Sequence, residues 1–136
     1  HQVAALGLIR ARGSDGVAVV TDGLPAMGLS PGRYEWMGRA VTTDGTAARL
    51  EDGGLAGSAT PMLQALRNLV GWGVRLEDAA RMCSRSGAIL SSAGDRKGEI
   101  AAGFDADLVL LDRELNLAAV YCGGVEAFAS RSFSSP

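Results

Sequence analysis

The sequence has 136 residues, 47% of them hydrophobic and 21% charged, with 13 basic and 15 acidic side chains and a formal net charge of −2. This composition is typical of a single globular domain and excludes the disordered and collagen-like classes. The basic residues form no stripe that could neutralise a run of phosphates, so we expect no nucleic-acid partner. No apolar stretch approaches the roughly twenty residues of a membrane helix, so we expect no membrane contact.

Residues 3–12 carry apolar side chains at every third position and are followed by Gly13, which predicts a helix. The apolar run Val17–Val20 comes next and ends at Thr21-Asp22-Gly23. A short apolar run bounded by turn residues predicts a strand buried on both faces, as in a parallel sheet. The order of helix, loop, buried strand and polar turn is typical of an α/β barrel or a doubly wound sheet.

Residues 32–54 change to short β-like stretches, which predict an inserted hairpin. Gly38 separates two of these stretches, and Asp44-Gly45 is a strong hairpin-turn signal. The predicted strands cover residues 33–37, 39–43 and 46–50. The following Leu55–Ser58 segment is expected to be a turn that leads into the next helix.

Two helices are predicted over residues 60–71 and 76–86, packed as a pair. Thr60 is a suitable N-cap for the first helix, and Pro61 suits its first helical position because no backbone N–H is needed there. The second helix carries Leu76, Ala80 and Cys83 on one face.

The last part of the chain returns to a β-like composition. Residues 97–100, 107–112 and 117–122 predict extended stretches, and the Ser-rich tail from residue 129 to 136 is expected to be loose. Asp105 and Asp107 are expected to lie on a turn that enters a strand and to point to different faces, which disfavours metal binding.

The two cysteines, Cys83 and Cys122, form no Cys-x-x-Cys pair, and His1 is the only histidine. We therefore expect no metal knuckle and predict both cysteines to be small buried side chains in a reduced, cytoplasmic protein. The chain begins with His1 and shows no targeting peptide, and we interpret it as part of a longer protein.

Asp22 is the best catalytic candidate because it follows the predicted buried strand, where barrels and open sheets place their working residues. A carboxylate at this position can take a proton from an attacking water and return it to a leaving group. The alternative is a turn aspartate that binds its own backbone, and position alone does not decide between the two.

Four features of the sequence occur together: Val19–Asp22, the inserted hairpin, Leu55-Ala56-Gly57-Ser58, and Arg67-Asn68-Leu69-Val70. In this combination they resemble the N-acetylglucosamine-6-phosphate deacetylase family of metal-dependent amidohydrolases. The closing segment from Asp105 to Asp112 resembles the amidohydrolase superfamily more generally.

The resemblance implies an α/β fold that is the C-terminal portion of a (β/α)8 TIM barrel plus strands of a small β-sandwich domain. Residues 1–93 would belong to the barrel, with its last strand at residues 17–21. Residues 94–128 would supply β-sandwich strands, and residues 129–136 a flexible tail.

The same resemblance implies the site. Asp22 would be the general base and acid that activates a metal-bound water. His1 would contact the sugar phosphate substrate, and Leu55, Ala56 and Gly57 would line the sugar pocket. The cofactor would be a divalent cation, zinc or iron, held mainly by residues absent from this chain. Alternatively, His1 is the stray first residue of a truncated chain or a tag remnant, and residues 55–57 form an ordinary loop.

The sequence therefore predicts hydrolysis of the N-acetyl amide of N-acetylglucosamine 6-phosphate to glucosamine 6-phosphate and acetate. The complete protein is expected to be a homodimer, and this chain alone is expected to be incomplete and inactive. Two alternatives stay open: another amide hydrolase of the amidohydrolase superfamily, or a non-catalytic barrel remnant that acts in assembly.

Overall fold

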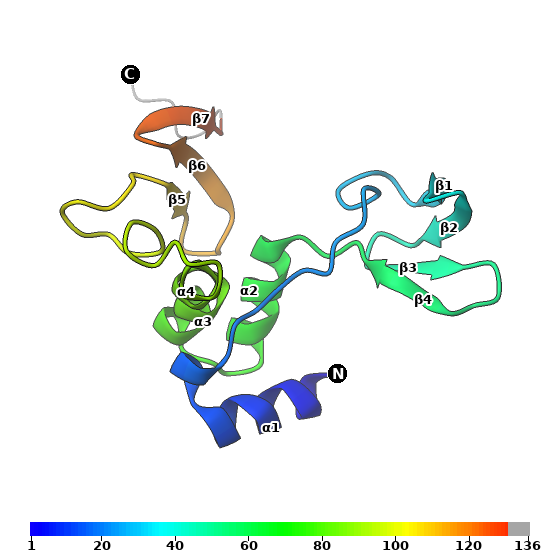
Figure 1. Ribbon diagram of the computed structural model, residues 1–136, viewed down its shortest axis with the longest axis horizontal. Helices are drawn as coiled ribbons and strands as arrows, with labels where there is room; N and C mark the ends of the chain where they lie inside the picture. Colours follow the sequence, from blue (N-terminus) through cyan, green and yellow to red (C-terminus); the bar gives the residue numbers. More distant parts are fainter. Residues whose placement is uncertain (131–136) are drawn as a thin grey trace.

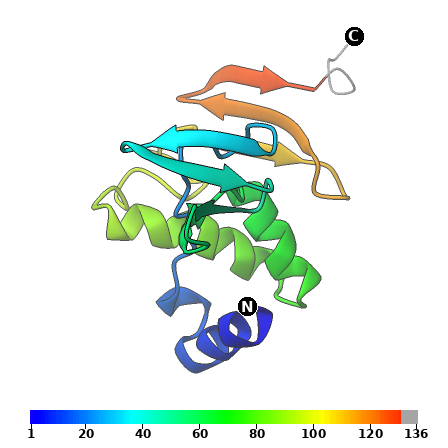
Figure 2. The ribbon, with the colours of Figure 1, turned by 90° about the vertical axis from the view of Figure 1, so that its right-hand side faces the viewer.

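The computed structural model describes residues 1–130 and contains helices and two separate antiparallel sheets. Figure 1 shows the helices α2, α3 and α4 between the two sheets, with strands β1–β4 on one side and β5–β7 on the other. Helix α1 lies at the end of the molecule away from β7, as both Figure 1 and Figure 2 show. The predicted α/β class is confirmed, whereas the barrel that the resemblance implies stays a prediction.

The first sheet has four strands in the order β1-β2-β3-β4, all antiparallel. Its strands are β1 (Gly32–Trp36), β2 (Arg39–Thr43), β3 (Ala47–Leu50) and β4 (Leu55–Ser58). The predicted antiparallel strands are confirmed, whereas their insertion after a barrel strand stays a prediction. Met37 and Gly38 connect β1 to β2 with positive φ at both residues, 51° and 71°, as a tight two-residue hairpin turn requires.

The predicted turn at Leu55–Ser58 is wrong, because this segment is strand β4. A run of leucine, alanine, glycine and serine has low intrinsic strand propensity, so nothing local favours an extended conformation. The strand forms because β3 pairs with it on one side, and an isolated parallel bridge joins Ser58 to Gly23 on the other.

The helices form the main hydrophobic core. They are α1 (Gln2–Arg12), α2 (Met62–Gly71), α3 (Leu76–Cys83) and α4 (Arg85–Leu90). Leu69 of α2 and Ala79 and Met82 of α3 are buried, and partly buried apolar side chains, Val17 and Val19 among them, pack against this cluster. The predicted helix over residues 3–12 is confirmed as α1, which has no buried residue. None of the helices in residues 1–130 has the length and hydrophobicity to cross a membrane.

Two details of the helix prediction are wrong. The predicted helix over residues 76–86 is broken at Ser84, where φ is −131° and ψ is −74°. The Ser84 hydroxyl donates to the carbonyl of Ala80 at 2.7 Å, which satisfies one acceptor at the end of α3. Thr60 is not the cap of α2: Pro61 occupies that position, and the Thr60 hydroxyl donates instead to the Thr46 carbonyl across the sheet.

The predicted strand at Val17–Val20 is also not formed. Val20 is 74% exposed, so the segment is not buried on both faces. A strand needs a hydrogen-bonded neighbour, and within residues 1–130 the parallel bridge at Gly23 is the only strand-like pairing near this segment.

The second sheet has the order β5-β6-β7. Strands β5 (Leu108–Leu111) and β6 (Leu117–Cys122) confirm two of the predicted stretches, whereas residues 97–100 form no strand. Strand β7 (Val125–Ala129) was not predicted, and Ser130 donates from its backbone N–H to Ala118, so the predicted loose tail begins in ordered structure. The rest of that tail, residues 131–136, lies outside the described residues.

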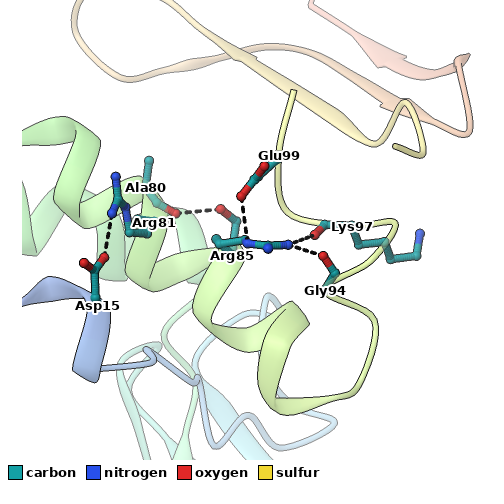
Figure 3. Close-up of polar contacts among 8 residues, drawn as sticks. Asp15, Ala80, Arg81, Arg85, Gly94, Lys97 and Glu99 are labelled. Carbon is teal, nitrogen blue, oxygen red and sulfur yellow. Dashed lines mark hydrogen bonds and ion pairs between the residues drawn. The ribbon is translucent and has the colours of Figure 1, made fainter. Parts of the chain in front are cut away.

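Arg85 joins α4 to the segment that leads to the second sheet (Figure 3). Its guanidinium donates to the carbonyls of Gly94 and Lys97, pairs with Glu99 at 2.9 Å, and lies 5.7 Å from the ring centroid of Phe104. One side chain therefore fixes the course of residues 94–104 against the helices.

Lys97 extends this connection toward β5. Its ammonium pairs with both Asp105 and Asp107, so these two carboxylates converge and the prediction that they point to different faces is wrong. The hydrogen bonds raise the pKa of Lys97 and lower the pKa of Asp105 and of Asp107. Because the Lys97 ammonium lies between both carboxylates, we interpret the two aspartates as structural residues.

Candidate functional site

The segment after residue 16 runs from the helices to the four-stranded sheet (Figure 1). Asp22 lies on this segment, next to Gly23, which bridges to Ser58 of β4. Its φ is 49°, a left-handed conformation that aspartate adopts more readily than most residues. The Asp22 carbonyl accepts the N–H of Ser58 at 2.9 Å, and the Ser58 carbonyl accepts the N–H of Leu24 at 3.1 Å. The backbone on both sides of the bridge residue Gly23 is thus fixed to β4, while Asp22 itself is exposed and its carboxylate is accessible.

Gly57 lies close to the backbone of Asp22 in this arrangement. It is buried, and a Cβ atom placed on it would lie 3.0 Å from the Asp22 carbonyl oxygen and 3.0 Å from Cγ of Leu24. The structure therefore brings two of the predicted site residues, Asp22 and Gly57, into direct backbone proximity.

A second anchor holds the segment before Asp22. The N–H of Val19 donates to the carbonyl of Met82 at 2.9 Å, and the Met82 side chain is fully buried in the helical core. The sequence offers no signal for this contact, because it depends on the helix break at Ser84 and on packing between distant segments. Asp22 therefore lies between two fixed points, α3 at Val19 and β4 at residues 22–24.

The turn before this segment is also tied to α3. The hydroxyl of Ser14 donates to Asp78 at 2.9 Å, and Arg81 pairs with Asp15 at 2.5 Å (Figure 3). The hydrogen bond with Asp15 raises the pKa of Arg81, and the two contacts together hold residues 14–16 against the helix.

The remaining predicted site residues are less closely joined to Asp22. Leu55 at the start of β4 is 66% exposed, and Ala56 is half-buried. His1 is exposed at the start of α1, where its carbonyl accepts the N–H of Ala5. Within residues 1–130, no hydrogen bond or ion pair joins His1 to Asp22 or to β4.

The residues present do not fit a metal centre by themselves. Among residues 1–130 there is no group of three or more His, Cys, Asp and Glu side chains that could hold a metal ion. A catalytic zinc site uses three protein ligands, and Asp22 offers one carboxylate. Residues 1–130 therefore do not hold a complete metal site.

A hollow lined in part by Leu24, two residues after Asp22, is small. It has a volume of about 100 Å³ and lies between the 24–29 segment and the sheet. Its lining residues are Leu24, Pro25, Ala26, Leu29, Tyr34, Glu35, Trp36 and Val41. Sites for small molecules usually enclose about 300–1,000 Å³, so this hollow does not hold a sugar phosphate. A second, open hollow of about 350 Å³ lies among polar residues at the tips of β2 and β3.

The cysteines do not add a nucleophile to the site. Burial raises the pKa of the Cys83 thiol, which keeps it protonated and unreactive at neutral pH. Cys122 is exposed at the end of β6, so the prediction that both cysteines are buried is wrong for this residue.

The comparison with protein families decides the class of protein. The model of the Amidohydrolase family matches residues 1–127. This chain belongs to the Amidohydrolase family. The resemblance inferred from the sequence is thereby confirmed at the level of the family.

The chain is also similar to individual members of this family. An N-acetylglucosamine-6-phosphate deacetylase from Bacillus subtilis is 36% identical over 96% of this chain and 33% of its own length. The crystal structure of an N-acetylglucosamine-6-phosphate deacetylase from Thermotoga maritima is 32% identical, with a TM-score of 0.86 over 95% of this chain and 36% of that protein.

A third relative was solved with its sugar. The N-acetyl-D-glucosamine-6-phosphate deacetylase from Mycobacterium smegmatis, as an aspartate-to-alanine variant in complex with N-acetyl-D-glucosamine-6-phosphate, is 27% identical. Its TM-score is 0.84 over 92% of this chain and 34% of that protein. The chain thus spans about a third of the length of the relatives it matches.

Proposed function

We propose that this chain is part of an N-acetylglucosamine-6-phosphate deacetylase, which hydrolyses the acetamide of its substrate to glucosamine 6-phosphate and acetate. The observation that carries the proposal is the match over 96% of the chain to a deacetylase with this activity in its name. The TM-score of 0.86 against a second deacetylase supports the same reading at the level of the fold.

Asp22 is the residue that we assign to the chemistry. It takes a proton from the water that attacks the acetyl carbonyl carbon, and a tetrahedral intermediate forms. The same carboxyl group then returns the proton to the amide nitrogen, the C–N bond breaks, and acetate and the free amine leave. An exposed carboxylate on a backbone fixed by two hydrogen bonds to Ser58 suits this double role.

The substrate site needs groups from outside these 136 residues. We propose that Leu55, Ala56 and Gly57 border the sugar, that His1 contacts the phosphate, and that most ligands of the divalent cation lie elsewhere in the protein. The exposed side chain of Leu55 is available for such a contact. The cytoplasmic location and the homodimer stay predictions from the sequence.

The test is acetate release from N-acetylglucosamine 6-phosphate by the full gene product that carries this chain. We expect Asp22→Asn to lower kcat by roughly 10²–10⁴-fold, because the amide cannot accept the proton, and to leave the content of bound metal unchanged. Asp95→Asn is the matched control, since Asp95 is exposed in the loop between α4 and β5, and its turnover should equal that of the unaltered protein.

Three outcomes discriminate between the candidate functions. Full turnover in Asp22→Asn would overturn the assignment of Asp22. Release of a different amine, with N-acetylglucosamine 6-phosphate left intact, would favour another amide hydrolase of the family. A protein that binds no metal and hydrolyses no amide would favour the non-catalytic assembly role.

A further inference from the structure

Gly57 stands out because the space around it, rather than its backbone conformation, requires a glycine. Its φ does not lie in the left-handed region, so an L-residue could adopt the backbone geometry. A Cβ atom would nevertheless stand 3.0 Å from the Asp22 carbonyl oxygen. This distance is tighter than nearly all real Cβ contacts, and a neighbour would have to move by a few tenths of an ångström.

The group that would have to move belongs to the residue that we assign to catalysis. The Asp22 carbonyl accepts a hydrogen bond from the N–H of Ser58. The φ of Asp22 is 49°, so this residue has a sparsely populated backbone conformation. A displaced carbonyl shifts the peptide unit next to the Asp22 Cα atom, from which the carboxylate projects. The close approach of β4 therefore bears directly on the backbone that carries the carboxylate.

We infer that Gly57 is a positioning residue for Asp22. Its missing side chain lets β4 lie directly against the Asp22 carbonyl, and that contact fixes the carboxylate for proton transfer. This inference rests on the proposed function, in which Asp22 is the general base and acid. It adds to the sugar contact proposed for Gly57, because the Cβ position of Gly57 faces the Asp22 carbonyl and Leu24. A residue that only touches the substrate would change KM and not kcat.

The test compares two glycine-to-alanine variants of the full gene product. We expect Gly57→Ala to lower kcat roughly tenfold or more with KM nearly unchanged, because catalysis is sensitive to sub-ångström misplacement of a reacting group. Gly87→Ala is the matched control: Gly87 lies in α4, nothing lies within 4 Å of a Cβ atom there, and its kcat should equal that of the unaltered protein.

A double variant shows whether Gly57 acts through Asp22. If it does, Gly57→Ala combined with Asp22→Asn should be no slower than Asp22→Asn alone, because the group that Gly57 positions is already lost. Losses that multiply would overturn the inference. So would a raised KM with unchanged kcat in Gly57→Ala, or full activity in that variant.

If Gly57→Ala folds poorly, the same question can be tested in a Leu24→Ala background. Leu24→Ala removes the 3.0 Å contact with Cγ and leaves the contact with the Asp22 carbonyl. In this background we expect Gly57→Ala still to lower kcat, whereas restored kcat would overturn the inference. If Asp22→Asn loses turnover and Gly57→Ala does not, only this inference fails. If Asp22→Asn keeps its turnover, the role assigned to Asp22 fails as well.

Discussion

At the scale of single residues, two aspartates show what local sequence can and cannot predict. The Asp44-Gly45 turn was predicted from the dipeptide alone, and Asp44 binds the backbone N–H groups of Thr46 and Ala47 within the same turn. The surroundings of Asp22 depend instead on Ser58 and Gly57, more than thirty residues away. Its position after an apolar run makes Asp22 a catalytic candidate, but its backbone partners could not be predicted from the sequence.

Asp44 leads to a prediction about pH. Hydrogen bonds from Ala47 and Thr46 lower the pKa of Asp44 from its ordinary 3.8 to about 2. Because the folded pKa is depressed, Asp44 stabilises the fold above about pH 4, and this contribution is lost as pH falls from about 4 toward 2. We expect the stability of the Asp44→Asn and Asp44→Ala variants to fall less steeply with decreasing pH over this window than the stability of the unaltered protein.

The two Asp44 variants also serve as controls for each other. At neutral pH we expect Asp44→Asn to lose less stability than Asp44→Ala, since the amide oxygen still accepts the turn N–H groups. The measurement is the denaturant midpoint of the full gene product between pH 2 and 7. An acid limb that is identical in Asp44→Asn and the unaltered protein would contradict the role given to this carboxylate.

At the scale of elements, the secondary structure that was predicted correctly is marked by local sequence signals. The elements predicted wrongly depend on pairing with distant segments. The Gly38 and Asp44-Gly45 turns marked the hairpin correctly. Strand β4 lacks strand-forming residues and exists because β3 and Gly23 pair with it. Strand β7 could have been found, because Gly123-Gly124 has positive φ at both residues and Gly-Gly is a known hairpin signal.

The contacts of Arg85, which join α4 to the segment before β5, can be tested directly. We expect Arg85→Lys to destabilise the fold by about 1–3 kcal/mol, because one ammonium cannot reach two carbonyls and Glu99 while it lies beside Phe104. Hydrogen exchange should also speed up at residues 94–104. The measurements are chemical unfolding and hydrogen exchange of the full gene product.

Arg75 provides the control for that prediction. It pairs with Glu77 at 3.6 Å, and both side chains are mostly exposed, so Arg75→Lys should change the free energy of unfolding by less than about 0.5 kcal/mol. Equal changes in the two variants would mean that Arg85 contributes no more than an ordinary surface arginine.

At the scale of the whole molecule, two observations suggest that further chain covers part of this surface. Several apolar side chains are exposed, and the chain spans only about a third of the length of its relatives. Ile100 is 92% exposed, Met37 81% and Val20 74%, although the chain carries a core of its own. A single exposed side chain is ordinary in a folded protein, but Val20 lies two residues before the proposed catalytic aspartate. The relatives are about three times as long, which leaves ample chain to cover this segment.

The last prediction therefore concerns the 136-residue chain produced alone. We expect it to release no acetate from N-acetylglucosamine 6-phosphate and to bind a hydrophobic dye, whereas the full gene product should be active and bind little dye. The reason is that residues 1–130 contain one proposed catalytic carboxylate but no group of ligands for a metal, and that the hollow lined by Leu24 is too small for the sugar. Deacetylation by the isolated chain would contradict this, because residues 1–136 would then hold a complete site. An inactive chain that regains turnover when mixed with the remainder of the protein would locate the missing groups in that remainder.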